Sequence, residues 1–211
     1  MDLGLKNRRA LIVGSTAGIG RGIAERLAEE GADVAICGRN VEGAKSLAGE
    51  IATSSGVTAR AYRVDLTDPA SVRSLIDDTT KDFGGFDIVV ANGGGPPPGG
   101  VANVTTEIWN AQFQPMFLSQ VEIARAFLPG MRERGWGRLL VVASSGTVQP
   151  IPHLGISNTL RVALTNWAKS LAGEVASDGV TVNSILPGRI DTARVHAIDE
   201  SAAKSQNKDV E

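Results

Sequence analysis

Short runs of apolar residues alternate with longer segments of mixed polarity along this chain of 211 residues. Six of the runs are nearly continuously apolar, a pattern typical of parallel strands that are covered on both faces. They lie at 10–14, 33–38, 59–64, 87–92, 138–144 and 180–186. We therefore predict one strand at each of these six places.

The segments between the runs show helical periodicity. After the first helix, which begins near residue 19, further helices are predicted at 41–53, 69–82, about 105–134 and 156–176. We expect Pro115 and Pro129 to disturb the long helix, because proline removes a backbone donor. The alternating order predicts an α/β fold with a doubly wound, right-handed parallel sheet, a three-layer Rossmann fold.

The composition limits the function more than it defines it. Hydrophobic residues make up 42% of the chain and charged residues 21%, which is the balance of a soluble globular protein. A net charge of −2 without a basic run gives no support for nucleic-acid binding. No apolar segment approaches the ~20 residues that a membrane-spanning helix needs, and we expect a cytoplasmic protein.

Cys37 is the only cysteine, and it lies in the apolar run 33–38. An internal disulfide is therefore excluded. We expect a reduced, buried thiol rather than a nucleophile. No group of residues with the spacing of metal ligands stands out, so no metal site is predicted.

The stretch "VGSTAGIG" follows the first strand and opens the first helix. Glycine permits the tight exit from the strand and lets the backbone approach a pyrophosphate, which the helix N-terminus attracts. This arrangement predicts a dinucleotide site. Its expected cofactor contacts are Gly14, Ser15, Thr16, Gly18, Ile19 and Gly20.

Arg39 ends the second strand, where a carboxylate would accept hydrogen bonds from a ribose 2′-hydroxyl and favour NAD. An arginine there pairs well with a 2′-phosphate. We therefore predict NADP(H) as the preferred cofactor, with NAD(H) as the alternative. The alternative, that Arg39 is a solvent-facing loop residue without a cofactor contact, stays open.

Further cofactor contacts are expected where the next two strands end. Asp65, followed by Leu66, can reach an adenine edge, although the aspartate could equally cap a helix. Asn92 precedes Gly93 and Gly94, which leave room for a ribose or a nicotinamide. The asparagine could instead brace the turn.

"LPGRIDT" follows the sixth strand. Pro187 and Gly188 form a turn beside the expected nicotinamide position, and Thr192 offers a hydroxyl to a carboxamide. A plain turn followed by a helix cap explains the same residues.

Taken in order, these motifs resemble the short-chain dehydrogenase/reductase family in its classical form, and especially its 3-oxoacyl-[acyl-carrier-protein] reductases. "GSTAGIG", "VDLTD", "ANGGG" and "GRLLVVASS" match the family's successive motifs, and 169–192 matches almost without gaps. The resemblance implies one Rossmann-type domain over 1–195 that binds the dinucleotide and carries the reaction. Residues 196–211 then form a polar tail, the start of a shortened substrate-covering segment.

The family's catalytic group is Asn, Ser, Tyr and Lys, of which the Tyr exchanges a proton with the substrate. Alignment through the gapless segment places Ser157 at the Tyr position and Arg161 at the Lys position. Ser144 falls at the catalytic Ser, with Ser145 as a near alternative. Met116 stands at the position where the Asn is expected. The simplest role for this methionine is hydrophobic packing. The resemblance thus implies a degenerate catalytic tetrad.

These replacements change the chemistry. A serine hydroxyl is a far weaker acid than a phenol and is shorter by a ring. Arg161 keeps a charge that can bond a ribose hydroxyl, but it does not release its proton easily. His153 could donate the proton instead, although a lone loop histidine is usually a surface residue. The chain is therefore either an NADP(H)-dependent oxidoreductase or a non-catalytic NADP(H)-binding or subunit-interaction module.

The resemblance also implies partners. The expected substrate is a small carbonyl or hydroxyl compound, which an acyl carrier can present. Family chains continue with a seventh strand that this chain lacks, so we expect one sheet edge to be unpaired. A homodimer or homotetramer through the helices at 105–134 and 156–176 is expected, although core packing explains the apolar stripe of the second helix equally well.

Overall fold

The computed structural model describes residues 2–206, and its centre is a sheet of six parallel strands. The strands are β1 (Arg9–Ile12), β2 (Asp33–Gly38), β3 (Ala59–Arg63), β4 (Ile88–Ala91), β5 (Gly137–Val142) and β6 (Val180–Ile185). Their order in the sheet is β3-β2-β1-β4-β5-β6. All six predicted strands are confirmed, with ends that differ by at most two residues. This order reverses direction between β1 and β4, where doubly wound folds bind their ligands.

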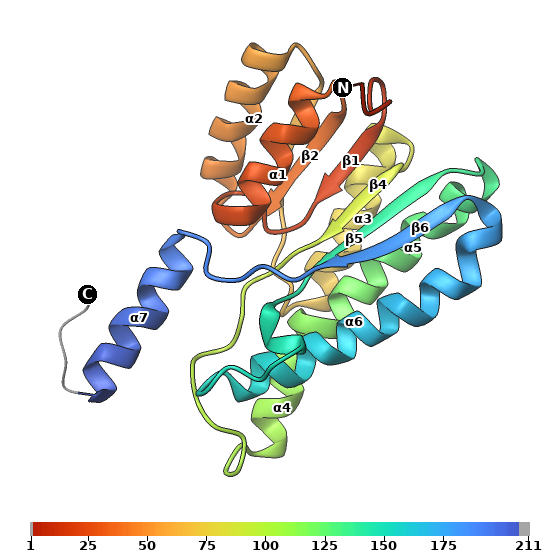
Figure 1. Cartoon of the computed structure of the whole chain (residues 1–211). Helices are drawn as coiled ribbons and strands as arrows, with labels where there is room; N and C mark the ends of the chain where they lie inside the picture. The colour runs from red at the N-terminus through yellow and green to blue at the C-terminus, as the bar shows by residue number, and fades with distance from the viewer. Residues whose placement is uncertain (1, 207–211) are drawn as a thin grey trace.

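Seven α-helices connect and flank these strands within the described residues. They are α1 (Gly18–Glu29), α2 (Val41–Ser55), α3 (Pro69–Phe83), α4 (Thr106–Phe113), α5 (Ser119–Glu133), α6 (Gly155–Val175) and α7 (Ala193–Gln206). Helices α1 and α2 lie on one side of the sheet, and α3, α5 and α6 lie on the other (Figure 1). The predicted three-layer α/β fold is therefore confirmed.

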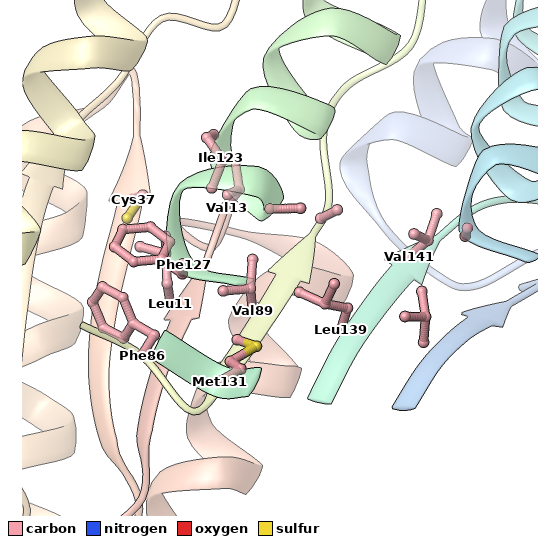
Figure 2. Close-up of a cluster of buried hydrophobic side chains, with 14 of the residues drawn as sticks. Leu11, Val13, Cys37, Phe86, Val89, Ile123, Phe127, Met131, Leu139 and Val141 are labelled. Atoms are coloured by element: carbon pink, nitrogen blue, oxygen red, sulfur yellow. The ribbon is translucent and has the colours of Figure 1, made fainter. Parts of the chain in front are cut away.

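The two faces of the sheet carry separate cores, because successive residues of a strand point to opposite faces. Leu11 of β1 faces the α3–α5–α6 side, whereas Ile12 faces α1 and α2. The first core includes Phe86, Phe127 and several strand residues (Figure 2). Phe86 and Phe127 meet edge to face, with ring centroids 5.0 Å apart. This continuous packing holds the carboxyl ends of β1 and β4 in fixed positions.

Cys37 lies in the same core and is fully buried. Burial raises the pKa of its thiol well above the usual value. The expectation of a buried, unreactive thiol agrees with this environment.

The long helix predicted at 105–134 is in fact interrupted. A π-helical segment, Gln114–Leu118, separates α4 from α5. Pro115 lies in this segment and has no N–H to donate to the preceding turn, which accounts for the break. The second expected disturbance is wrong, because α5 continues across Pro129 to Glu133.

Two features near the end of the chain differ from the prediction. Helix α7 begins at Ala193, before the predicted boundary at 195, and runs to Gln206, so most of the predicted polar tail is helical. The prediction for residues 207–211 lies outside the described residues. Among residues 2–206, strand β6 pairs only with β5. Thr181 and Asn183 leave part of one face exposed, so cover on both faces does not extend to this strand. No helix among residues 2–206 has the length and apolar character needed to cross a bilayer.

Candidate functional site

Two adjoining cavities open at the carboxyl ends of the strands, at the switch point between β1 and β4. The first, the Arg39 cavity, measures about 440 Å³, and the second, the Ser157 cavity, about 340 Å³. Gly14, Gly93, Gly94 and Gly95 line both. The Arg39 cavity is lined further by Thr16, Arg39, Asp65 and Leu66. The Ser157 cavity is lined further by Gly18, Ile19, Gly20, Asn92, Ser144, Ser157, Arg161, Pro187, Gly188 and Thr192.

The glycine-rich turn has a backbone that only glycine adopts easily. Gly14 and Gly18 have φ values of +62° and +55°. A Cβ atom at Gly20 would collide with the carbonyl oxygen of Gly14, so helix α1 packs directly on the turn. No side chain caps the start of α1, so its first N–H groups remain available to an anion. These features fit a dinucleotide diphosphate.

Asn92 braces this turn. Its Nδ2 donates to the carbonyl oxygens of Val13 and Gly14, each at 3.0 Å. Of the two roles considered for Asn92, the structure thus contains the bracing one, while the side chain also lines the Ser157 cavity. The end of β4 and the glycine turn are therefore joined through one amide.

Ser15 differs from the rest of the predicted cofactor set. It is fully buried and lines neither cavity. Its hydroxyl donates to the carbonyl of Ile12 at 2.6 Å and accepts from the N–H of Cys37 at 2.9 Å, while its own N–H donates to the carbonyl of Cys37. The serine therefore ties β1 to β2, and both its hydroxyl and its N–H are engaged within the protein.

The Arg39 cavity combines a free arginine with an ordered carboxylate. Arg39 is exposed directly after β2. Asp65 accepts from the hydroxyl and the N–H of Thr67 at 2.7 and 3.0 Å, which lowers the pKa of its carboxyl. Asp68, not Asp65, caps α3, because its carboxylate accepts from the N–H of Ala70. The helix-cap alternative for Asp65 is therefore wrong.

Arg39 provides the first test of this site. We expect Arg39→Ala to weaken NADPH binding by about 10- to 100-fold, the range of a lost hydrogen bond to a charged group. NADH affinity should change less than threefold, because NADH has no 2′-phosphate. Titration of protein fluorescence with both cofactors measures the ratio. An equal loss for NADPH and NADH would contradict the assignment.

The Ser157 cavity brings together Ser144, Ser157 and Arg161, which the motif alignment predicts at the family's catalytic positions. Ser144 caps a short 3₁₀ turn, and its Oγ accepts from the N–H of Gly146 at 3.1 Å. Ser157 stands in the first turn of α6 and lines the same cavity. Ser145 does not line it, and its N–H donates to the carbonyl of Pro187. The structure therefore favours Ser144 over Ser145.

Arg161 occupies the floor of the cavity. Its Nη1 donates to the carbonyl of Val142 at 2.9 Å, and its Nη2 lies 3.4 and 3.3 Å from the carbonyl oxygens of Gly93 and Gly94. Burial, followed by the charge of Arg194, lowers the pKa of its guanidinium. The arginine thus connects the end of β5 to the loop after β4.

His153 and Met116 do not join this group. His153 is exposed, has a φ of +61° and lines neither cavity. The structure therefore does not bring its imidazole to the serines. Met116 is buried with Ile156 and Leu160, although it also touches the Arg39 cavity. Hydrophobic packing thus replaces the amide expected there.

Thr192 caps α7. Its Oγ1 accepts from the N–H of Val195 at 3.4 Å, and its methyl group lies against Gly18. The structure therefore contains the predicted helix cap, and Thr192 lines the Ser157 cavity as well.

Two residues of this region were missed by the sequence analysis. Gln120 is buried on α5, where its Nε2 lies 3.4 Å from the carbonyl oxygen of Asn92 and its Oε1 has no protein partner. Its spacing of four from Met116 was the available signal, since both lie on one helical face. Arg194 lines the Ser157 cavity from α7. It lies just after the Pro-Gly turn, where no motif indicates that its side chain returns to the cavity.

Comparison with known proteins identifies the family. A model of the short chain dehydrogenases matches residues 8–203. An uncharacterized oxidoreductase of Bacillus subtilis, YvrD, is 34% identical over 211 residues, which cover all of this chain and 79% of the relative. The 3-oxoacyl-[acyl-carrier-protein] reductase FabG of Escherichia coli is 30% identical over 200 residues, 94% of this chain and 80% of the relative.

A solved structure agrees with this result. L-sorbose reductase from Gluconobacter frateurii, complexed with NADPH and L-sorbose, is 34% identical and has a TM-score of 0.90. The match covers 97% of this chain and 78% of the reductase. The chain therefore belongs to the short-chain dehydrogenase/reductase family, and the resemblance inferred from the motifs is confirmed.

Proposed function

We propose that this protein is an NADP(H)-dependent oxidoreductase that interconverts carbonyl and hydroxyl groups with an altered acid–base pair. The observation that carries the proposal is the Ser157 cavity. It joins the glycine turn, the Pro187–Gly188 turn and the hydroxyl of Ser144 in one space. Its neighbour, the Arg39 cavity, is lined by the positively charged Arg39, which supports the binding of a 2′-phosphate.

Each part of the site has a role in this proposal. Gly18 and Gly20 hold the diphosphate at the start of α1, and Arg39 binds the 2′-phosphate. NADPH, when bound, supplies the hydride. Ser144 orients the substrate carbonyl, and Arg161 places a positive charge near the developing oxyanion. Neither Ser157 nor Arg161 gives up a proton easily at neutral pH, so we propose that the proton comes from bulk solvent. Water held by the serines relays it, passing one proton to the substrate oxygen and taking one from solvent.

The relatives support the substrate class. FabG of Escherichia coli is named as a reductase of 3-oxoacyl groups on an acyl-carrier protein. The Gluconobacter enzyme is named as a reductase of L-sorbose. We therefore propose that the substrate of this chain is a small carbonyl or hydroxyl compound. The narrower proposal is that this substrate is linked to an acyl carrier.

A homodimer or homotetramer through the α4–α5 and α6 surfaces belongs to the same proposal. Ile108, Leu118 and Val162, which lie on these elements, are all more than 40% exposed, and they support it. The cytoplasmic location remains a prediction.

The alternative, a non-catalytic NADP(H)-binding or subunit-interaction module, rests on the motif alignment of the sequence. A serine and an arginine, Ser157 and Arg161, occupy the positions of the family's Tyr and Lys. A phenol titrates near pH 10, whereas a serine hydroxyl does not serve as an acid or base at pH 7. The two functions predict the same cofactor binding and differ only in turnover.

We expect the double variant Ser157→Tyr, Arg161→Lys to increase ketone reduction by about 100-fold or more, the typical contribution of a positioned acid–base group. The measurement is NADPH oxidation with a panel of 3-oxoacyl esters, ketones and quinones, for the wild type and the variant. Ser157→Phe, Arg161→Lys is the matched control, because it restores the ring without the hydroxyl. It should show no increase.

The outcomes separate the two functions. NADPH binding without turnover in the wild type and in the double variant would contradict the oxidoreductase and support the binding module. Absence of NADPH binding would contradict both.

A further inference from the structure

Two guanidinium groups from distant parts of the chain meet beside the loop after β4. Arg161 comes from α6, and Arg194 comes from the first turn of α7, which lies next to this loop (Figure 1). A Cβ atom built on Gly95 would lie 3.2 Å from Nη2 of Arg194 and 3.9 Å from Nη2 of Arg161. Both arginines line the Ser157 cavity. Two positive charges are thus concentrated at one wall of the cavity.

No carboxylate among the described side chains balances these charges. Arg161 donates only to carbonyl oxygens, and Arg194 donates to the carbonyl of Pro96 at 2.6 Å. The acids that flank Arg194 are engaged elsewhere, since Asp191 contacts His196 and Asp199 contacts Arg189. A guanidinium has five N–H groups, so each arginine keeps donors that the protein does not use.

The placement of these charges is unfavourable without an anion. Like charges at short range repel each other, although the repulsion here is partly screened because Arg194 is exposed. The neighbouring charge and burial both act to lower the pKa of Arg161. Arg194 also stands in the first turn of α7, where the helix dipole opposes a positive charge. A bound anion would remove all three costs at once.

We propose that Arg161 and Arg194 bind the carboxylate of the substrate, so that the substrate is an oxo acid or the corresponding hydroxy acid. This inference rests on the proposed oxidoreductase function and narrows its substrate class. The planar fork of a guanidinium matches a carboxylate in a bidentate contact. The arginines lie on the Ser144 and Ser157 side of the cavity, whereas the start of α1 already offers N–H groups to a cofactor diphosphate.

The experiment compares oxo acids with their methyl esters. Pyruvate, acetoacetate and levulinate, with the carbonyl at increasing distance from the carboxylate, are each assayed with NADPH beside the methyl ester. We expect at least one acid to be preferred over its ester by about tenfold or more in kcat/KM, the range for a hydrogen bond to a charged group. Arg194→Gln should remove this preference by lowering kcat/KM for the acid alone.

Controls separate charge from structure. Arg194→Lys keeps the charge and should retain most of the preference. Lys169→Gln removes an exposed positive charge on α6 that lines neither cavity, and it should leave every kcat/KM unchanged. The NADPH dissociation constant of Arg194→Gln should stay within twofold of the wild type. An increase beyond that would assign the arginines to the cofactor diphosphate and overturn the proposal, as would equal turnover of acids and esters.

A binding measurement keeps the inference distinct from the proposed function. Calorimetric titration of the wild type with acetoacetate and with methyl acetoacetate requires no turnover. Binding of the acid alone, lost in Arg194→Gln, would support the carboxylate site even if no substrate is reduced. Failure of the acid to bind, together with turnover of neutral ketones, would overturn the carboxylate site and leave the oxidoreductase intact.

Discussion

Gly20→Ala is expected to reduce NADPH-dependent turnover by on the order of 100-fold, because a small misplacement of positioning groups costs about that much. A Cβ atom at Gly20 would collide with the carbonyl of Gly14 and would lie 2.7 Å from Nδ2 of Asn92. Helix α1 must then move away from the turn that it contacts. The extra methyl group should also lower the free energy of unfolding by ~1–3 kcal/mol, as overpacking does.

The same helix provides a matched control. A Cβ atom at Gly22 would meet no atom within 4 Å. Gly22→Ala should therefore stabilise the protein by about 0.5–1 kcal/mol through helix propensity and leave NADPH affinity unchanged. Fluorescence titration measures the NADPH affinity of both variants, and urea unfolding measures their free energy of unfolding. NADPH oxidation measures their turnover. Wild-type affinity in Gly20→Ala would show that the close contact between α1 and the turn does not position the cofactor.

Asp87→Ala is expected to lower the free energy of unfolding at pH 7 by about 3 kcal/mol, the lower end for breaking a buried ion pair. Asp87 is 3% exposed. It accepts from the N–H and Nε of Arg9 at 3.0 and 3.3 Å and from Nε of Arg134 at 3.1 Å. One carboxylate thus joins the start of β1, the start of β4 and the end of α5.

The comparison for Asp87 is an exposed pair on the same protein. Asp178 pairs with Arg132, whose side chain is 53% exposed. Asp178→Ala should cost less than about 1 kcal/mol, because solvent screens such pairs. Equal losses for the two variants would mean that burial does not strengthen the Asp87 network.

The effect of Asp87 depends on pH in a defined direction. Burial alone would raise the pKa of the Asp87 carboxyl, but hydrogen bonds and charge from Arg9, together with the charge of Arg134, outweigh it and lower the pKa. Its stabilisation is therefore complete above the unfolded-state pKa of about 3.9 and is lost as the pH falls through the lower folded-state value. The difference between the wild type and Asp87→Ala should accordingly shrink below about pH 4.

Strands β1, β2, β4 and β5 were predictable because helices cover them, which leaves a continuous apolar run, whereas β3 and β6 are partly exposed. The glycine turn was predictable for a similar reason, since its backbone requires glycine at particular positions. Ser15 shows the limit of such motifs. The motif suggests a contact with a ligand, but the direction of the side chain depends on β2, which packs beside it.

The parts that escaped prediction depend on contacts between distant segments. Pro115 predicted a disturbance of the helix at 105–134, but proline alone does not indicate that the backbone there widens into a π segment instead of kinking. Arg194 follows a turn in a polar stretch, and only the fold returns it to the loop after β4. His153 shows the opposite error, because nearness in sequence to Ser157 did not bring its side chain to the cavity.

The bracing of the glycine turn by Asn92 has a consequence for the energetics of cofactor capture. Two hydrogen bonds from one amide hold the turn before any ligand arrives. Ordering a flexible loop costs on the order of 1–2 kcal/mol per residue, and this pre-organised turn avoids most of that cost. The cofactor should therefore bind to a preformed turn and lose little binding free energy to the ordering of the backbone.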